Sequence, residues 1–100
     1  MPDNIHWVGD RLILAGMQYD EPACGGTRKV IDGKADDMRC HRGYSVAEID
    51  PAHLTFRLVA YDGPNASFNG VSAAVTIDDE LWIGSYQSDR VAVRSLGKAR

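Results

Sequence analysis

The stretch GDRLILAG, residues 9–16, decides the fold because its pattern returns as DDELWIGS at residues 78–85. Each stretch opens with an acidic turn, continues into an apolar run and ends in two small residues. Leu12 corresponds to Leu81, so the two stretches lie 69 residues apart. The repeat indicates two related units, and removing about 20 residues of polar loop brings the offset near the length of one four-stranded β-propeller blade.

The residues around the repeat form short apolar runs separated by turn residues, a pattern typical of β-strands. We therefore predict an all-β fold, an antiparallel meander of about seven strands. The expected strands are residues 4–8, 12–17, 44–49, 54–61, 71–77, 81–86 and 90–96. The polar residues 18–43 contain glycines, a proline and many charges, and are expected to form a long loop.

The strands divide into two units of unequal size. Residues 1–64 are expected to form one complete four-stranded propeller blade that carries the loop 18–43, and residues 65–100 a three-stranded partial final blade. Units of this kind cannot bury their faces alone, so the chain is expected to be part of a larger closed structure. The exposed apolar surface should include Trp7, Ile13, Trp82 and Ile83. An open strand edge should also favour self-association with another copy.

The composition fits one small globular domain. The chain has 100 residues, of which 44% are hydrophobic and 25% charged, and a formal net charge of −3. Lysine and arginine are scattered rather than clustered, which argues against a nucleic-acid partner. No apolar run is long enough to cross a bilayer and no targeting segment follows Met1, so we expect a soluble chain without a membrane partner.

Three stretches of the chain carry a likeness to a known group of proteins. They are PDNIHWVGDRLILAG (2–16), YSVAEIDPAHLTFRLVAYDGP (44–64) and VSAAVTIDDELWIGSYQSDRVAV (71–93). In order and spacing they resemble the C-terminal part of the six-bladed β-propellers of the senescence-marker-protein/gluconolactonase, paraoxonase-type arylesterase and strictosidine-synthase-like group.

The resemblance implies a metal-dependent hydrolase of small lactones or esters. In that group Ca²⁺ or another divalent cation sits in the central funnel, held by side chains from several blades, and polarises the substrate's carbonyl or phosphoryl oxygen. Because most of those blades are not in this chain, we expect it to be inactive when isolated. The alternatives are a non-catalytic propeller module that binds a partner, or a truncated remnant.

The resemblance places two metal ligands at Asp3 and Asn4, where an acid and an amide open the first strand. Both supply the hard oxygen atoms that Ca²⁺ prefers, although Ca²⁺ takes six to eight such ligands. The second repeat has Ser72 and Ala73 at the same offset, so a strand of this kind does not require the pair. The alternative is that Asp3 and Asn4 only cap a turn.

His6 is the one catalytic candidate, since alternation along the strand places it opposite Ile5 and Trp7, where it could face the funnel as a general base. A lone histidine on a strand is more often structural. The paraoxonase-type histidine is expected just after the second strand, but residues 15–18 read Ala-Gly-Met-Gln. That departure puts paraoxonase-type chemistry in doubt.

Cys24 and Cys40 bracket the polar loop. They allow one disulfide, two free thiols or, with His41, a zinc site whose spacing matches no standard finger. The resemblance favours the disulfide, because related bacterial propellers have similar cysteine-bracketed loops. If the two cysteines pair, an oxidising compartment is implied.

Overall fold

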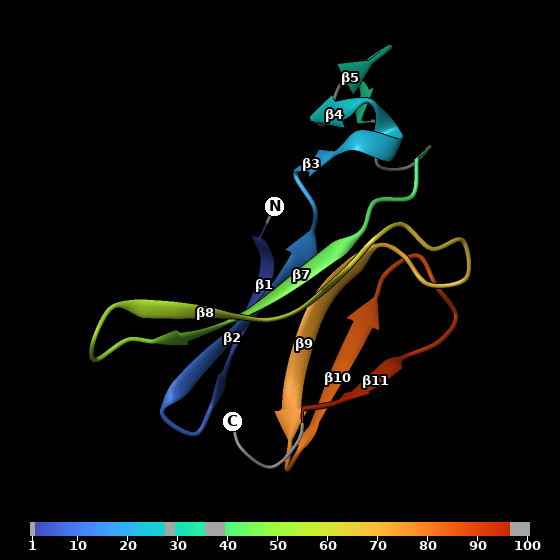
Figure 1. The fold of residues 1–100 in the computed structure, drawn as a ribbon. Coiled ribbons are helices and arrows are strands. Elements are labelled where there is room, and N and C mark those ends of the chain that lie inside the picture. The colour runs from blue at the N-terminus through green and yellow to red at the C-terminus, as the bar shows by residue number, and fades with distance from the viewer. Residues whose placement is uncertain (1, 28–29, 36–39, 97–100) are drawn as a thin grey trace.

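The computed structural model describes residues 2–27, 30–35 and 40–96 and consists of antiparallel β-sheets (Figure 1). A four-stranded sheet, the first sheet, has the order β1-β2-β7-β8. Its strands are β1 (Pro2–Val8), β2 (Arg11–Met17), β7 (Tyr44–Asp50) and β8 (Thr55–Asp62). A three-stranded sheet, the second sheet, consists of β9 (Val71–Ile77), β10 (Glu80–Ser85) and β11 (Ala92–Ser95). The predicted all-β meander of seven main strands is confirmed.

The polar loop contains secondary structure that its sequence did not indicate. β3 (Asp20–Glu21) pairs with β4 (Gly26–Thr27), and the short 3-10 helix η1 (Pro22–Cys24) connects them. β5 (Val30–Ile31) pairs with β6 (Lys34–Ala35). These elements extend beyond the ends of β2 and β7 (Figure 1). Strands of two residues are too short to show the alternation from which a strand is predicted.

Buried Arg42 holds the base of this loop together. Its guanidinium donates hydrogen bonds to the carbonyl oxygens of Tyr19 at 3.1 Å and Gly26 at 3.0 Å. Nearby, the buried carboxylate of Glu21 accepts a hydrogen bond of 2.8 Å from the backbone N–H of Gly43. Buried charges require such partners, and these contacts join the two ends of the loop to each other.

The repeat seen in the sequence is also a repeat of strand register. The cross-strand partners are Asn4–Ala15, Ile5–Leu14 and Trp7–Leu12 in the first sheet, and Ala73–Gly84, Ala74–Ile83 and Thr76–Leu81 in the second. Each ladder is interrupted at the same place by a β-bulge, which leaves Asp3 in one sheet and Ser72 in the other without a partner in the register. The offset of 69 residues therefore describes the backbone as well as the sequence.

The core lies between the two sheets, which pack face to face through what we call their inner faces. The buried residues there are Ile13, Ala15, Tyr44, Val46 and Ala60 of the first sheet and Val71, Ala74, Leu81 and Ile83 of the second. The expectation that Ile13 and Ile83 would be exposed is wrong, because each sheet covers the other at these positions. Trp7 and Trp82 do remain exposed, by 65% and 39%.

The sheets lie closest together at their first strands, where β9 runs alongside β1 and β2 (Figure 1). This arrangement places the two bulges next to each other. Among the described residues, no helix has the length and apolar character needed to span a bilayer.

Candidate functional site

The acid–amide pair Asp3 and Asn4 occupies the bulge of β1. In a regular strand consecutive side chains point to opposite faces. The extra residue at the bulge changes that alternation, and the Nδ2 atom of Asn4 lies 3.5 Å from Oδ1 of Asp3. Both residues are exposed. The bulge thus brings the two side chains together at the start of the first strand, with the amide nitrogen of Asn4 directed at the Asp3 carboxylate.

A contact with the second sheet orients the Asn4 amide. Its Nδ2 atom donates a hydrogen bond of 3.0 Å to the carbonyl oxygen of Ser72, the bulged residue of β9. The same nitrogen also faces Oδ1 of Asp3, so both of these contacts of the Asn4 side chain are made by its N–H groups. The described residues contain no group of three or more His, Cys, Asp and Glu side chains placed to hold a metal ion. Asp3 and Asn4 can therefore supply only part of a Ca²⁺ coordination shell.

His6 is exposed and lies on β1 next to an open hollow of about 390 Å³. Trp7, Ala73, Val75 and Trp82 line the same hollow, which is mainly apolar. Among the described side chains, none forms a hydrogen bond with the His6 ring that would orient it as a general base. The geometry gives His6 a position beside an apolar surface but no catalytic partner.

Gln18 stands just after β2, where the resemblance expects a histidine, and it has a structural role. Its backbone N–H donates to the carbonyl oxygen of Gly43 at 2.7 Å, and its side-chain Nε2 donates to that of Tyr44 at 3.3 Å. These bonds join the end of β2 to the start of β7. The side chain at this position therefore stabilises the loop base.

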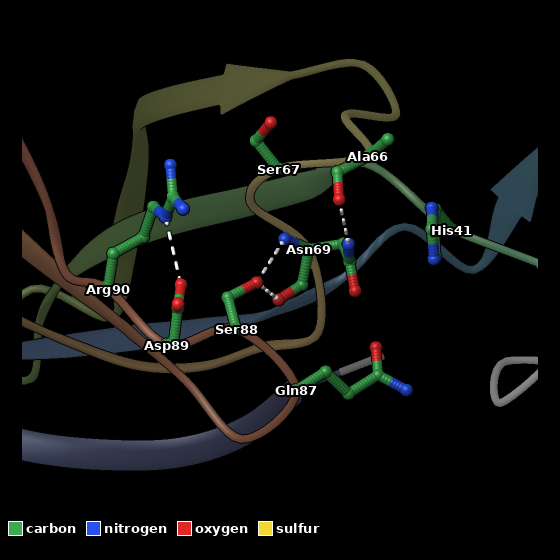
Figure 2. A pocket seen from close by; sticks show the side chains of 8 residues that line it. All are labelled: His41, Ala66, Ser67, Asn69, Gln87, Ser88, Asp89 and Arg90. Carbon is green, nitrogen blue, oxygen red and sulfur yellow. Dashed lines mark hydrogen bonds and ion pairs between the residues drawn. The ribbon is translucent and has the colours of Figure 1, made fainter.

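A polar pocket of about 480 Å³, which the sequence reasoning missed, lies between two loops (Figure 2). The β8–β9 loop and the β10–β11 loop form it, with His41 at one side. Its lining residues are His41, Ala66, Ser67, Asn69, Gln87, Ser88, Asp89 and Arg90. In the sequence most of these residues belong to turn segments, while the pattern suggests His41 only as a zinc ligand and Arg90 only as the start of a strand.

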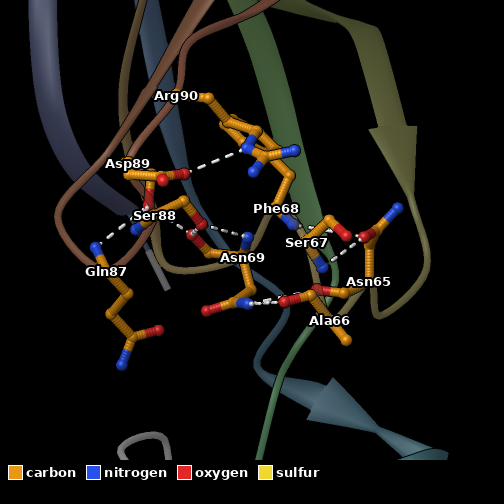
Figure 3. Close-up of polar contacts among 10 residues, drawn as sticks. Asn65, Ala66, Ser67, Phe68, Asn69, Gln87, Ser88, Asp89 and Arg90 are labelled. Carbon is orange, nitrogen blue, oxygen red and sulfur yellow. Dashed lines mark hydrogen bonds and ion pairs between the residues drawn. The ribbon is translucent and has the colours of Figure 1, made fainter.

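Hydrogen bonds join the two loops of the pocket (Figure 3). The Ser88 hydroxyl accepts from the backbone N–H of Asn69 at 2.9 Å and lies 3.2 Å from the Asn69 carbonyl oxygen, to which it donates. The buried Asn69 side chain donates to the carbonyl oxygen of Asn65 at 3.1 Å. Ser85 also donates to the Asn69 carbonyl oxygen. Asn69 thus joins the two loops of the pocket, because it forms hydrogen bonds with residues of both.

The charges at the rim of the pocket compensate each other. Arg90 donates a hydrogen bond of 3.0 Å to Asp89, and this bond holds the pKa of Asp89 below its ordinary value. The remaining described lining groups are mostly hydroxyls and amides. Such a lining suits a polar, uncharged ligand better than it suits proton transfer or nucleophilic attack.

Cys24 and Cys40 form a disulfide, with their Cα atoms 5.9 Å apart. Of the three arrangements that the sequence left open, the structure has the bonded pair rather than free thiols or a zinc site with His41. The bond ties η1 to the strand-side end of the polar loop and is compatible with an oxidising compartment.

We also compared the chain with known proteins. The searches of protein-family models, curated proteins and solved structures each returned no match.

Proposed function

We propose that this chain is the C-terminal part of a β-propeller hydrolase that acts on lactones or esters with a divalent cation such as Ca²⁺. In this proposal Asp3 and Asn4 are two of the oxygen ligands, and the others come from further sheets of the ring. The observation that carries the proposal is the acid–amide pair at the bulge of β1. The equivalent bulge of β9 has Ser72 and Ala73, so the backbone does not require an acid and an amide there.

Each residue has a distinct role in the proposed site. The Asp3 carboxylate supplies negative charge, and the Asn4 carbonyl oxygen supplies a neutral donor whose direction is fixed by the bond to Ser72. The cation, when bound, would polarise the carbonyl group of the substrate. The chain's own contribution is to position the ligands, since His6 has no orienting partner among the described residues.

A non-catalytic binding module is the second candidate, and the polar pocket around Asn69 favours it. Its side chains are held by internal hydrogen bonds and its described lining lacks a nucleophile paired with a base. These features favour binding of a polar ligand over catalysis in this pocket. Titration with small polyols and sugars, compared with lactones and aryl esters, distinguishes the two candidates.

Calorimetric titration with CaCl₂ tests the metal proposal. The chain should bind Ca²⁺ weakly, with a Kd on the order of millimolar, because two side chains fill a minority of the coordination sites. Asp3→Asn should abolish this binding. Asp10→Asn makes the same charge change at an exposed turn acid and should leave the binding unchanged.

Two results would contradict the proposal. One is binding that survives Asp3→Asn but is lost in Asp10→Asn. The other is a tight, stoichiometric site that depends on neither residue. Metal-dependent turnover of a lactone by single copies of the chain would contradict the expectation that the site is incomplete.

A further inference from the structure

The first sheet has a second, uncovered face that is as apolar as its core. Strand register assigns this outer face two rows of side chains, because directly paired residues share a face. The rows are Trp7, Leu12, Ile49 and Phe56, and Ile5, Leu14, Ala47 and Leu58. Phe56 is 78% exposed and Trp7 65% exposed. None of the eight carries a charge, whereas the neighbouring inner-face row contains the ion pair Glu48–Arg57.

The second sheet also has an outer face that is largely exposed, although Val75 and Trp82 border the hollow that they share with His6 and Trp7 of β1. The central row of this face is Val75, Trp82 and Val93, which are paired across β9, β10 and β11 and are all exposed. Ile77 extends the same face towards the β9–β10 turn. Monomeric proteins rarely leave apolar patches of this extent uncovered, so both outer faces require a partner.

The repeat identifies what each outer face is built to contact. At the offset of 69 residues, Leu12 and Leu14 of the first sheet's outer face correspond to Leu81 and Ile83 of the second sheet's inner face. Likewise Trp82, on the second sheet's outer face, corresponds to Ile13, on the first sheet's inner face. The two inner faces already pack together within the chain. Over the strands that the offset relates, β1 and β2 with β9 and β10, the two outer faces are the counterparts of the two inner faces.

We propose that the outer face of the second sheet in one copy packs on the outer face of the first sheet in a second copy. The contact repeats between copies the packing seen between the sheets of one copy. It joins two different surfaces, so each added copy again presents one face of each kind. Head-to-tail contacts of this type form a closed ring or an open stack. This inference applies to the chain by itself; within the larger propeller proposed above, further sheets of the ring would cover the same two faces.

Two single-face variants test the proposal. Phe56→Glu places a charge on the first sheet's outer face, and Val93→Glu places one on the second sheet's. Both positions are exposed within one copy, so neither change removes core packing. Each variant alone should sediment as single copies, because it lacks one of the two required faces. Mixed together they should form a 1:1 dimer through the two intact faces, while the unmodified chain forms larger assemblies.

One control variant and three possible results that refute the proposal complete the test. Ala52→Glu adds the same charge at an exposed turn away from both faces and should assemble like the unmodified chain. Formation of the mixed dimer also shows that both variants are folded. Single copies of the unmodified chain would overturn the proposal. Self-association of either variant alone would show that like faces pair, and a mixture that stays monomeric would show that the outer faces do not pack together.

Discussion

Leu12 and Leu81 are the same residue at equivalent positions of the repeat, and they offer a matched comparison of the two faces. Leu81 is fully buried between the sheets, whereas Leu12 lies partly buried on the outer face. Truncation of a buried leucine to alanine costs about 3 kcal/mol, from lost burial and the cavity left behind. Leu12→Ala in a single copy should cost only about 1 kcal/mol, because less of its surface is removed from water.

Urea unfolding in the Phe56→Glu background measures this difference on single copies. The predicted gap of about 2 kcal/mol corresponds to a difference in Tm of roughly 8 to 16 °C for a chain of this size. In the assembling chain the outer face is covered, so the cost of Leu12→Ala should rise towards that of Leu81→Ala. Equal costs in single copies, or a larger cost at Leu12, would show that the sheets do not pack through the faces described.

Three further predictions concern the loop base and a turn. Reduction of the loop disulfide should lower the free energy of unfolding by about 3 kcal/mol, since it closes a loop with a sequence separation of 16, and urea unfolding with and without reductant measures this. Gly43→Ala should destabilise the chain by about 2 kcal/mol or more in the same assay, because a Cβ there would lie 2.2 Å from the Asp62 carbonyl oxygen. The hydrogen bond from His53, with the charge of Arg11, holds the pKa of Asp50 below its ordinary value of 3.8. The ionised Asp50 carboxylate therefore stabilises the fold above pH 3.8, and this stabilisation is lost as the pH falls below 3.8. The Tm of Asp50→Asn, measured as a function of pH, should show a smaller decrease in acid than the Tm of the unmodified chain.

The seven main strands could be predicted because each is an apolar run bounded by turn residues. The strand from Val71 to Ile77 was predicted with its exact bounds, and the others differ by a few residues at their ends. Alternation also gives which residues share a face. Alternation does not show which face is covered. Ile13 and Trp82 are equivalent in the repeat, yet Ile13 is buried between the sheets and Trp82 is exposed on an outer face.

The candidate site could be predicted in part. Asp3 and Asn4 were visible as an acid–amide pair, but the bulge that brings them together depends on pairing with β2. The polar pocket forms where two loops meet. The contact between Asn69 and Ser88 could not be predicted from the sequence, because it depends on how the two loops lie in space. Similarly, the paired strands β3 and β4 are held by hydrogen bonds from Arg42 to the carbonyl oxygens of Tyr19 and Gly26, and nothing near Arg42 in the sequence indicates this role.

The shared bulge separates the backbone shape of the proposed cation site from the residue types that would bind the ion. Ser72 and Ala73 occupy the same backbone geometry as Asp3 and Asn4, and the two bulges already touch through the bond between Asn4 and the Ser72 carbonyl oxygen. Replacing Ser72 with aspartate and Ala73 with asparagine should therefore graft a second pair of ligands beside the first without altering strand pairing. In the proposed site the backbone would supply the position, and the residue types at two positions would supply the metal ligands.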